Sequence, residues 1–160
     1  ATLTEKGETE IKGSFLLLYS KEDMDKTAGE VVSELAKNGV GIVDVHDIID
    51  GSQTSVVSAN LSFVMDLTAG VLVIPSESLE KDKVISTCLS NATIKKVENK
   101  KRLIPIYTED NISGKIPFGL LGTVGINWDG KVENRRAMAG KDRTINQLQE
   151  LAKKNTSKLG

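Results

Sequence analysis

The segment from residue 46 to residue 51 combines residue types that a recognition site or a general base would need. It contains the only histidine of the chain, two aspartates, two isoleucines and a glycine: His46, Asp47, Ile48, Ile49, Asp50 and Gly51. A histidine acting as a general base needs an orienting partner, and the side chain of Asp47 points elsewhere if the segment is extended. Apolar residues held between charges on a loop resemble a small interface core with a polar rim. We therefore predict a partner-binding loop, although either isoleucine could instead fold back onto the domain.

A basic cluster lies near residue 100 and consists of Lys95, Lys96, Lys100, Lys101 and Arg102. It falls at the predicted end of a helix, where the helix dipole favours each cation by about 0.3–1 kcal/mol. That explanation is sufficient, but the cluster could also meet an acidic loop of a partner. A head-to-tail contact between Asp47 and Asp50 of one molecule and this cluster of another would be weak and sensitive to salt.

Metal, thiol and phosphate chemistry are not predicted. Cys88 is the single cysteine and lies in an apolar helical pattern, which indicates a buried, inert thiol and leaves no cysteine-based metal cluster. The chain has neither Gly-x-x-x-x-Gly-Lys-Ser/Thr nor a Gly-x-Gly-x-x-Gly after its first predicted strand. Residues 20–23 are too acidic for a flavin phosphate, and Ile74 and Pro75 stand where a phosphoacceptor aspartate would be needed.

Five short apolar runs alternate with helical patterns along the chain. The predicted strands are residues 15–19, 40–45, 71–74, 103–107 and 123–128. The predicted helices run from the cap at Ser20 to Asn38, over 54–67, over 79–98, and from Asp142 or Thr144 onward. This alternation predicts an α/β fold: a flavodoxin-like, doubly wound, five-stranded parallel sheet in the order 2-1-3-4-5 with helices on both faces. Pro105 favours a place near the sheet edge for the fourth strand, because proline cannot donate to a ladder.

Composition is that of one globular domain. The chain has 160 residues, of which 39% are hydrophobic, and a formal net charge of −1. This charge and an aromatic content of 4% argue against nucleic-acid binding, and no apolar run reaches the roughly 20 residues of a membrane helix. We predict a flexible lead-in or linker over 1–13, the domain over 14–155 and a tail over 156–160. A cytoplasmic location is expected, without direct membrane insertion.

Several motifs together resemble the Toll/interleukin-receptor (TIR) domain family over roughly residues 13–155. The family begins with an aromatic residue, a hydrophobic strand and a Tyr-Ser-like end followed by acids, and residues 15–23 read Phe-Leu-Leu-Leu-Tyr-Ser-Lys-Glu-Asp. The phrase from Lys101 to Ile106 is similar to that of an adaptor TIR domain. The Arg-Asp-x-x-Pro-Gly motif of the family keeps Asp47 and Gly51 but has lost its arginine and proline, and the Phe-Trp motif of the last helix is missing.

The resemblance implies a signalling domain that assembles with other TIR domains in innate-immune-type signal transduction. A domain of this kind is expected to need no cofactor. We expect weak self-association, which an Ile49→Asp substitution would reduce and which an Asp50→Pro substitution would make less dependent on salt without disturbing the fold.

Cleavage of NAD, here the substrate, is the alternative that the family implies, since some TIR domains use a glutamate near the start of the helix after the third strand. Alignment without gaps places Thr87 there, whereas Glu77 and Glu80 lie upstream and would need a register shift. A threonine cannot stabilise the developing cation, so we expect no appreciable NAD hydrolysis. A flavodoxin-like ligand-binding module is a third possibility.

Overall fold

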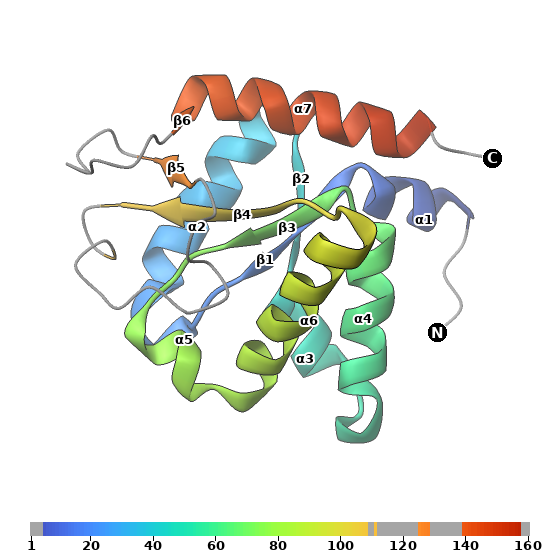
Figure 1. The fold of residues 1–160 in the computed structure, drawn as a ribbon, viewed down its shortest axis with the longest axis vertical. Coiled ribbons are helices and arrows are strands. Elements are labelled where there is room, and N and C mark those ends of the chain that lie inside the picture. Colours follow the sequence, from blue (N-terminus) through green and yellow to red (C-terminus); the bar gives the residue numbers. More distant parts are fainter. Residues whose placement is uncertain (1–4, 109–110, 112–124, 129–138, 158–160) are drawn as a thin grey trace.

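Parallel strands form the centre of the protein in the computed structural model, which describes residues 5–108, 111, 125–128 and 139–157 (Figure 1). The strands lie in the order β2-β1-β3-β4-β5-β6, and each neighbouring pair is parallel. Their bounds are β1 Ser14–Leu18, β2 Gly41–Asp44, β3 Gly70–Val73, β4 Leu103–Tyr107, β5 Ile126–Asn127 and β6 Ala139–Gly140. The predicted order of the first five strands is confirmed. The two-residue strand β6 was not predicted.

Helices cover both faces of this sheet, as expected of a doubly wound fold (Figure 1). Their bounds are α1 Glu5–Lys12, α2 Lys21–Lys37, α3 Val45–Gly51, the 3₁₀ turn η1 Thr54–Val56, α4 Val57–Leu67, α5 Glu77–Lys81, α6 Lys83–Asn99 and α7 Lys141–Ser157. Helices α4 and α6 contact each other on one face. On the other face, α7 reaches α2 through Lys141 and Glu34 and through a hydrogen bond from Gln149 to the backbone of Asn38.

The apolar runs of the sequence become strands that are buried on both sides. All four residues of β3 are buried, and the apolar residues of β1 from Phe15 to Leu18 are fully buried. Helix α2 presents Met24, Ala28, Val31 and Leu35 to this core, as its apolar periodicity predicts. The core therefore consists of the central strands β1 and β3 and the helix faces packed on them.

The amino-terminal segment corrects one expectation. A loose lead-in was predicted for residues 1–13, but residues 5–12 form helix α1, which contacts α4, α7 and β1. Ile11 packs against the core, the hydroxyl of Ser14 donates to Glu10 O at 2.7 Å, and the Asn155 amide donates to Lys12 O at 2.7 Å. Asn155 lies 143 residues from Lys12, so a prediction from local pattern could not include this contact.

The proline in β4 is accommodated by the way this strand pairs with its two neighbours. Val71 N donates to the backbone oxygen of Arg102, the residue before β4. Backbone polar groups of successive strand residues point to alternate sides, so Arg102 and Ile104 face β3 and Pro105 faces β5. Strand β5 pairs with β4 only from Ile106 onward, so the missing donor of Pro105 interrupts no pairing between these strands. The described strands beyond β4 are β5 and β6, with two residues each, so the expected place of β4 near the sheet edge is confirmed.

Candidate functional site at the carboxyl ends of the strands

Doubly wound sheets bind ligands at the carboxyl ends of their strands, at the point where the strand order reverses. Here that point lies between β1 and β3. Asp23 from the first turn of α2 spans it, accepting hydrogen bonds from the hydroxyl of Ser76 at 2.8 Å and from Ser78 N at 3.3 Å. Ser20 caps α2 by accepting from Glu22 N. The polar groups at the switch point are thus bound to one another.

Asn111 joins the ends of β3 and β4. Its amide nitrogen donates to Pro75 O and to Ile106 O, both at 3.0 Å, and its side-chain oxygen accepts from Thr108 N at 2.6 Å. The side chain is buried. All of these groups are therefore satisfied without solvent, and Asn111 acts as a structural clamp. Asn111 was not among the predicted site residues.

The predicted recognition loop is a helix. Residues 45–51 form α3, and Asp44 is its N-cap, with Oδ1 accepting from His46 N at 2.8 Å. The other oxygen of Asp44 accepts from the Tyr19 hydroxyl at 2.7 Å. An aspartate at the end of a strand and three residues before Asp47 is a helix start signal, which our prediction missed.

His46 is fixed by the same cluster. Its Nε2 lies 2.8 Å from the backbone oxygen of Tyr19, and the two rings meet edge to face with centroids 4.7 Å apart. A carbonyl oxygen can only accept, so Nε2 must carry the proton in this hydrogen bond. The ring is therefore held in place by Tyr19, and no carboxylate among the described residues pairs with it as a general base would require.

Tyr19 remains a neutral donor in this arrangement. Burial raises the pKa of its hydroxyl well above the usual range, and the hydrogen bond and charge of Asp44 and the charges of Asp25 and Asp47 raise the pKa further. We refer to Tyr19, Asp44 and His46 as the tyrosine cluster. It fixes α3 to the ends of β1 and β2.

The helical conformation decides which residues of segment 46–51 face outward. Ile48 and Ile49 are half-buried and pack against the core, so the expectation of two exposed isoleucines was wrong. They follow the buried Val45 by three and four positions and share its face of the helix. Asp47 and Asp50 are exposed, and the Oδ2 atom of Asp50 lies 3.9 Å from the Nζ atom of the exposed Lys21.

This conformation also changes how the segment can be tested. Ile49→Asp would place a charge against the core, so a loss of self-association in that variant would not report on an interface. Asp50→Pro would remove a backbone donor from the last turn of α3 and would not leave the local structure intact.

The basic cluster is partly engaged within the molecule. Lys95 pairs with Asp66, and the ammonium of Lys101 donates to Asp66 O at 3.0 Å and to Thr68 O at 2.6 Å. Lys101 thereby satisfies backbone carbonyls at the end of α4. Lys100 adopts the left-handed conformation that ends α6, with φ of 55°. In addition to the helix dipole, contacts with α4 therefore hold Lys95 and Lys101 within the molecule.

Glu77 and Glu80, the candidate carboxylates for NAD cleavage, lie on the short helix α5. Glu77 and Glu80 are both exposed, and Thr87 is exposed on α6. A single helix was predicted over 79–98, but Asp82 separates α5 from α6 and caps the latter by accepting from Val84 N and Ile85 N at 3.0 and 3.1 Å. Among the described residues, no hydrogen-bond partner holds the side chain of Glu77 or Glu80 in a fixed geometry.

Cys88 is buried on α6, as predicted, and burial raises the pKa of its thiol to about 12. The reactive thiolate is therefore nearly absent near neutral pH. We expect iodoacetamide to leave Cys88 unmodified in the native protein at pH 8 and to modify it fully in about 6 M guanidinium chloride, where burial is lost. Mass spectrometry of both samples checks this, and rapid native modification would contradict the buried position.

Within the parts of the chain that the structure describes, no helix has the length and apolar character to cross a membrane, and no three acidic, histidine or cysteine side chains gather as metal ligands. Comparison of the sequence with protein-family models and with curated proteins found no match for this chain.

Proposed function

We propose that the chain is a cytoplasmic TIR-type signalling domain that works by assembling with other TIR domains in innate-immune-type signal transduction. The observation that carries this proposal is the acidic surface at the carboxyl ends of β1 and β2. The exposed carboxylates of this surface belong to α2 and α3: Glu22, Asp25, Asp47 and Asp50. The tyrosine cluster holds α3 in place behind them. A charged surface on a rigid support suits recognition of a basic partner surface.

Residues that carry the family resemblance have consistent structural roles. The segment 15–23 provides β1, the N-cap Ser20 and the first turn of α2, and Asp47 lies on the element that follows β2. The positions of these elements on a doubly wound sheet agree with the fold that the resemblance implies. The missing family motifs leave the identity of the partner open to experiment.

Assembly suits this surface better than catalysis does. Asp23, Asp44 and Asn111 use their polar atoms for hydrogen bonds that join strands and helices. The two glutamates of the alternative reading are exposed on α5, and an exposed carboxylate is poorly placed to exclude water from an oxocarbenium-like transition state. No observation favours NAD cleavage as a second function.

The proposal predicts association that depends on Asp47 and Asp50. The double variant Asp47→Asn/Asp50→Asn keeps the side-chain size and removes two exposed charges. Each exposed ion pair contributes about 0–1 kcal/mol, so we expect the dissociation constant of the self-complex to rise about threefold to tenfold at low salt. Sedimentation equilibrium at about 50 mM and about 500 mM NaCl measures this constant. For the parent protein the dissociation constant should rise by a similar factor at the higher salt concentration, because salt screens the contact.

Asp142→Asn is the matched control, because it removes an exposed carboxylate from α7, away from α3. The control should associate like the parent protein. Association that is insensitive to salt, or equal in the double variant and the parent, would contradict the acidic surface as the contact.

The same protein incubated with NAD at high concentration is expected to release no nicotinamide above the level in buffer. Chromatographic detection of nicotinamide checks this. Release that disappears in Glu77→Ala or Glu80→Ala would replace the assembly proposal with the enzymatic one.

A further inference from the structure

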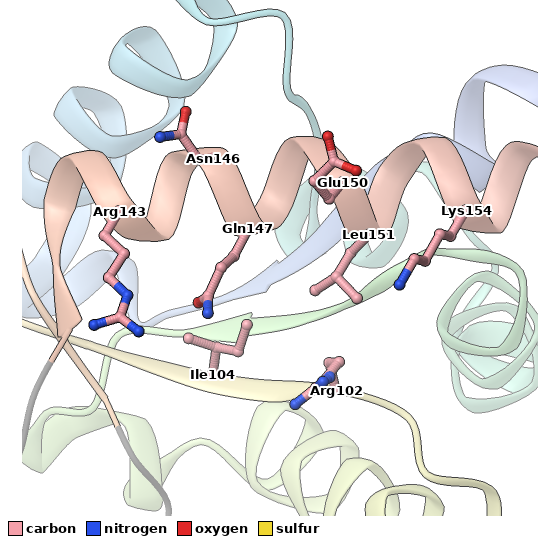
Figure 2. A pocket seen from close by; sticks show the side chains of 8 residues that line it. All are labelled: Arg102, Ile104, Arg143, Asn146, Gln147, Glu150, Leu151 and Lys154. Atoms are coloured by element: carbon pink, nitrogen blue, oxygen red, sulfur yellow. The ribbon is translucent and has the colours of Figure 1, made fainter.

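A groove of about 400 Å³ lies between α7 and the first half of β4 (Figure 2). This volume is within the range of small-molecule sites, about 300–1,000 Å³. Its floor is apolar and consists of Ile104 from β4 and Leu151 from α7, both half-buried. Neither side of this groove belongs to the acidic surface or to the switch point of the sheet.

Cations stand at both ends of this floor. Arg143, Gln147, Leu151 and Lys154 project from one face of α7 toward β4, whereas Asn146 and Glu150 point away from the strand (Figure 2). Lys154 and Arg102 lie toward one end and Arg143 toward the other (Figure 2). Eleven residues separate Arg143 from Lys154, which at about 1.5 Å per residue places their backbones roughly 16 Å apart.

Three cations and one carboxylate line the groove. Among the residues that the structure describes, the ion pairs of α7 join Lys141 to Glu34 and Lys153 to Glu150, and none involves Arg102, Arg143 or Lys154. Glu150 lines the groove, but its side chain points away from β4 (Figure 2) and pairs with Lys153. The lining therefore has a formal charge of +2 in a chain of net charge −1, which makes the groove electrostatically complementary to an anion.

We propose that this groove binds an elongated organic anion with a carboxylate or phosphate at each end of a short apolar body. The apolar body would cover Ile104 and Leu151. One acidic group would meet Arg143, whose planar guanidinium suits bidentate contact, and the other would meet Arg102 and Lys154. This inference does not depend on the proposed assembly function.

The probe is octanedioate, and methyl NMR signals of Ile104 and Leu151 report its binding at constant ionic strength. Octanoate has the same chain with one acidic group and should bind at least threefold more weakly. Hexane-1,6-diyl bisphosphate, tested in parallel, shows whether the site takes phosphate as well as carboxylate ends. Arg143→Gln and Lys154→Gln should each raise the dissociation constant of octanedioate about threefold to fivefold, the size of one exposed ion pair.

Lys26→Gln is the control, since it removes the same charge from an exposed position of α2 outside the groove. It should leave octanedioate binding unchanged. Equal loss in Lys26→Gln and Lys154→Gln, or equal affinity for octanoate and octanedioate, would overturn the proposal. It would also be overturned if the methyl signals moved with protein concentration but not with the probes, because the groove would then be a contact between copies of the chain. None of these outcomes bears on Asp47 and Asp50, so the two proposals can fail separately.

Discussion

Asn111→Ala is expected to lower the free energy of unfolding by about 3 kcal/mol, because removing a buried hydrogen-bonding partner costs about 1–3 kcal/mol for each group left behind. The side chain donates to Pro75 O and Ile106 O and accepts from Thr108 N. Alanine removes all three bonds, and two of them join the end of β3 to the end of β4. Urea unfolding followed by circular dichroism measures the change, with an unaltered m-value indicating that the denatured state is the same.

Asn60→Ala provides the comparison. Asn60 also donates a hydrogen bond from its side-chain amide, to the Ser52 hydroxyl at 2.9 Å, but it is exposed on α4. Water replaces that bond readily, so the cost should be within about 0.5 kcal/mol. Similar unfolding midpoints for the two variants would show that Asn111 does not clamp the strands.

Asp44→Ala is expected to cost about 2–3 kcal/mol. Loss of the N-cap of α3 accounts for about 1 kcal/mol, and the Tyr19 hydroxyl loses its acceptor, which accounts for most of the rest. Asp44→Asn keeps one acceptor oxygen, which can still receive the N-cap bond from His46 N, but its amide nitrogen cannot accept from the Tyr19 hydroxyl, so it should recover about 1 kcal/mol of the loss. Thermal and urea unfolding measure both variants, and Asp47→Ala, on an exposed residue of the same helix, should change stability by less than about 0.5 kcal/mol.

The pH dependence gives a second test of the tyrosine cluster. The pKa of Tyr19 is higher in the native protein than in the unfolded chain, so the stabilisation is fully present below about pH 10, the ordinary tyrosine pKa, and is lost as the pH rises above it. Asp44→Asn removes a negative charge that raises this pKa, so the Tyr19 pKa should fall in a spectrophotometric titration. An unchanged titration would show that Asp44 does not interact with the hydroxyl.

The sheet was predictable because its information is local. Continuous apolar runs at β1 and β3 and the periodic apolar face of α2 identify buried parallel strands and a covering helix without any tertiary contact. The order of the first five strands then followed from the general rules of doubly wound sheets. The sixth strand is only two residues long, and two residues carry no periodic signal.

The site was less predictable because its contacts are distant in sequence. Tyr19 and Asp44 are 25 residues apart, Asp23 and Ser76 are 53 apart, and Asn111 reaches back 36 residues to Pro75. The loop predicted over 46–51 is a helix for a different reason: Asp44, just before it, is a local helix start signal that the prediction did not use. Cys88 was predicted correctly from the apolar pattern around it.

The unequal strand lengths bear on the form that an assembly of this chain can take. In the part of the chain that the structure describes, the sheet ends at β2, with four residues, and at β6, with two. Growth of a sheet by strand addition needs a longer row of unpaired backbone groups, and short edge strands prevent it. Copies of this protein should therefore join through side chains, remain separable by salt, and resist conversion into amyloid-like fibres while they stay folded.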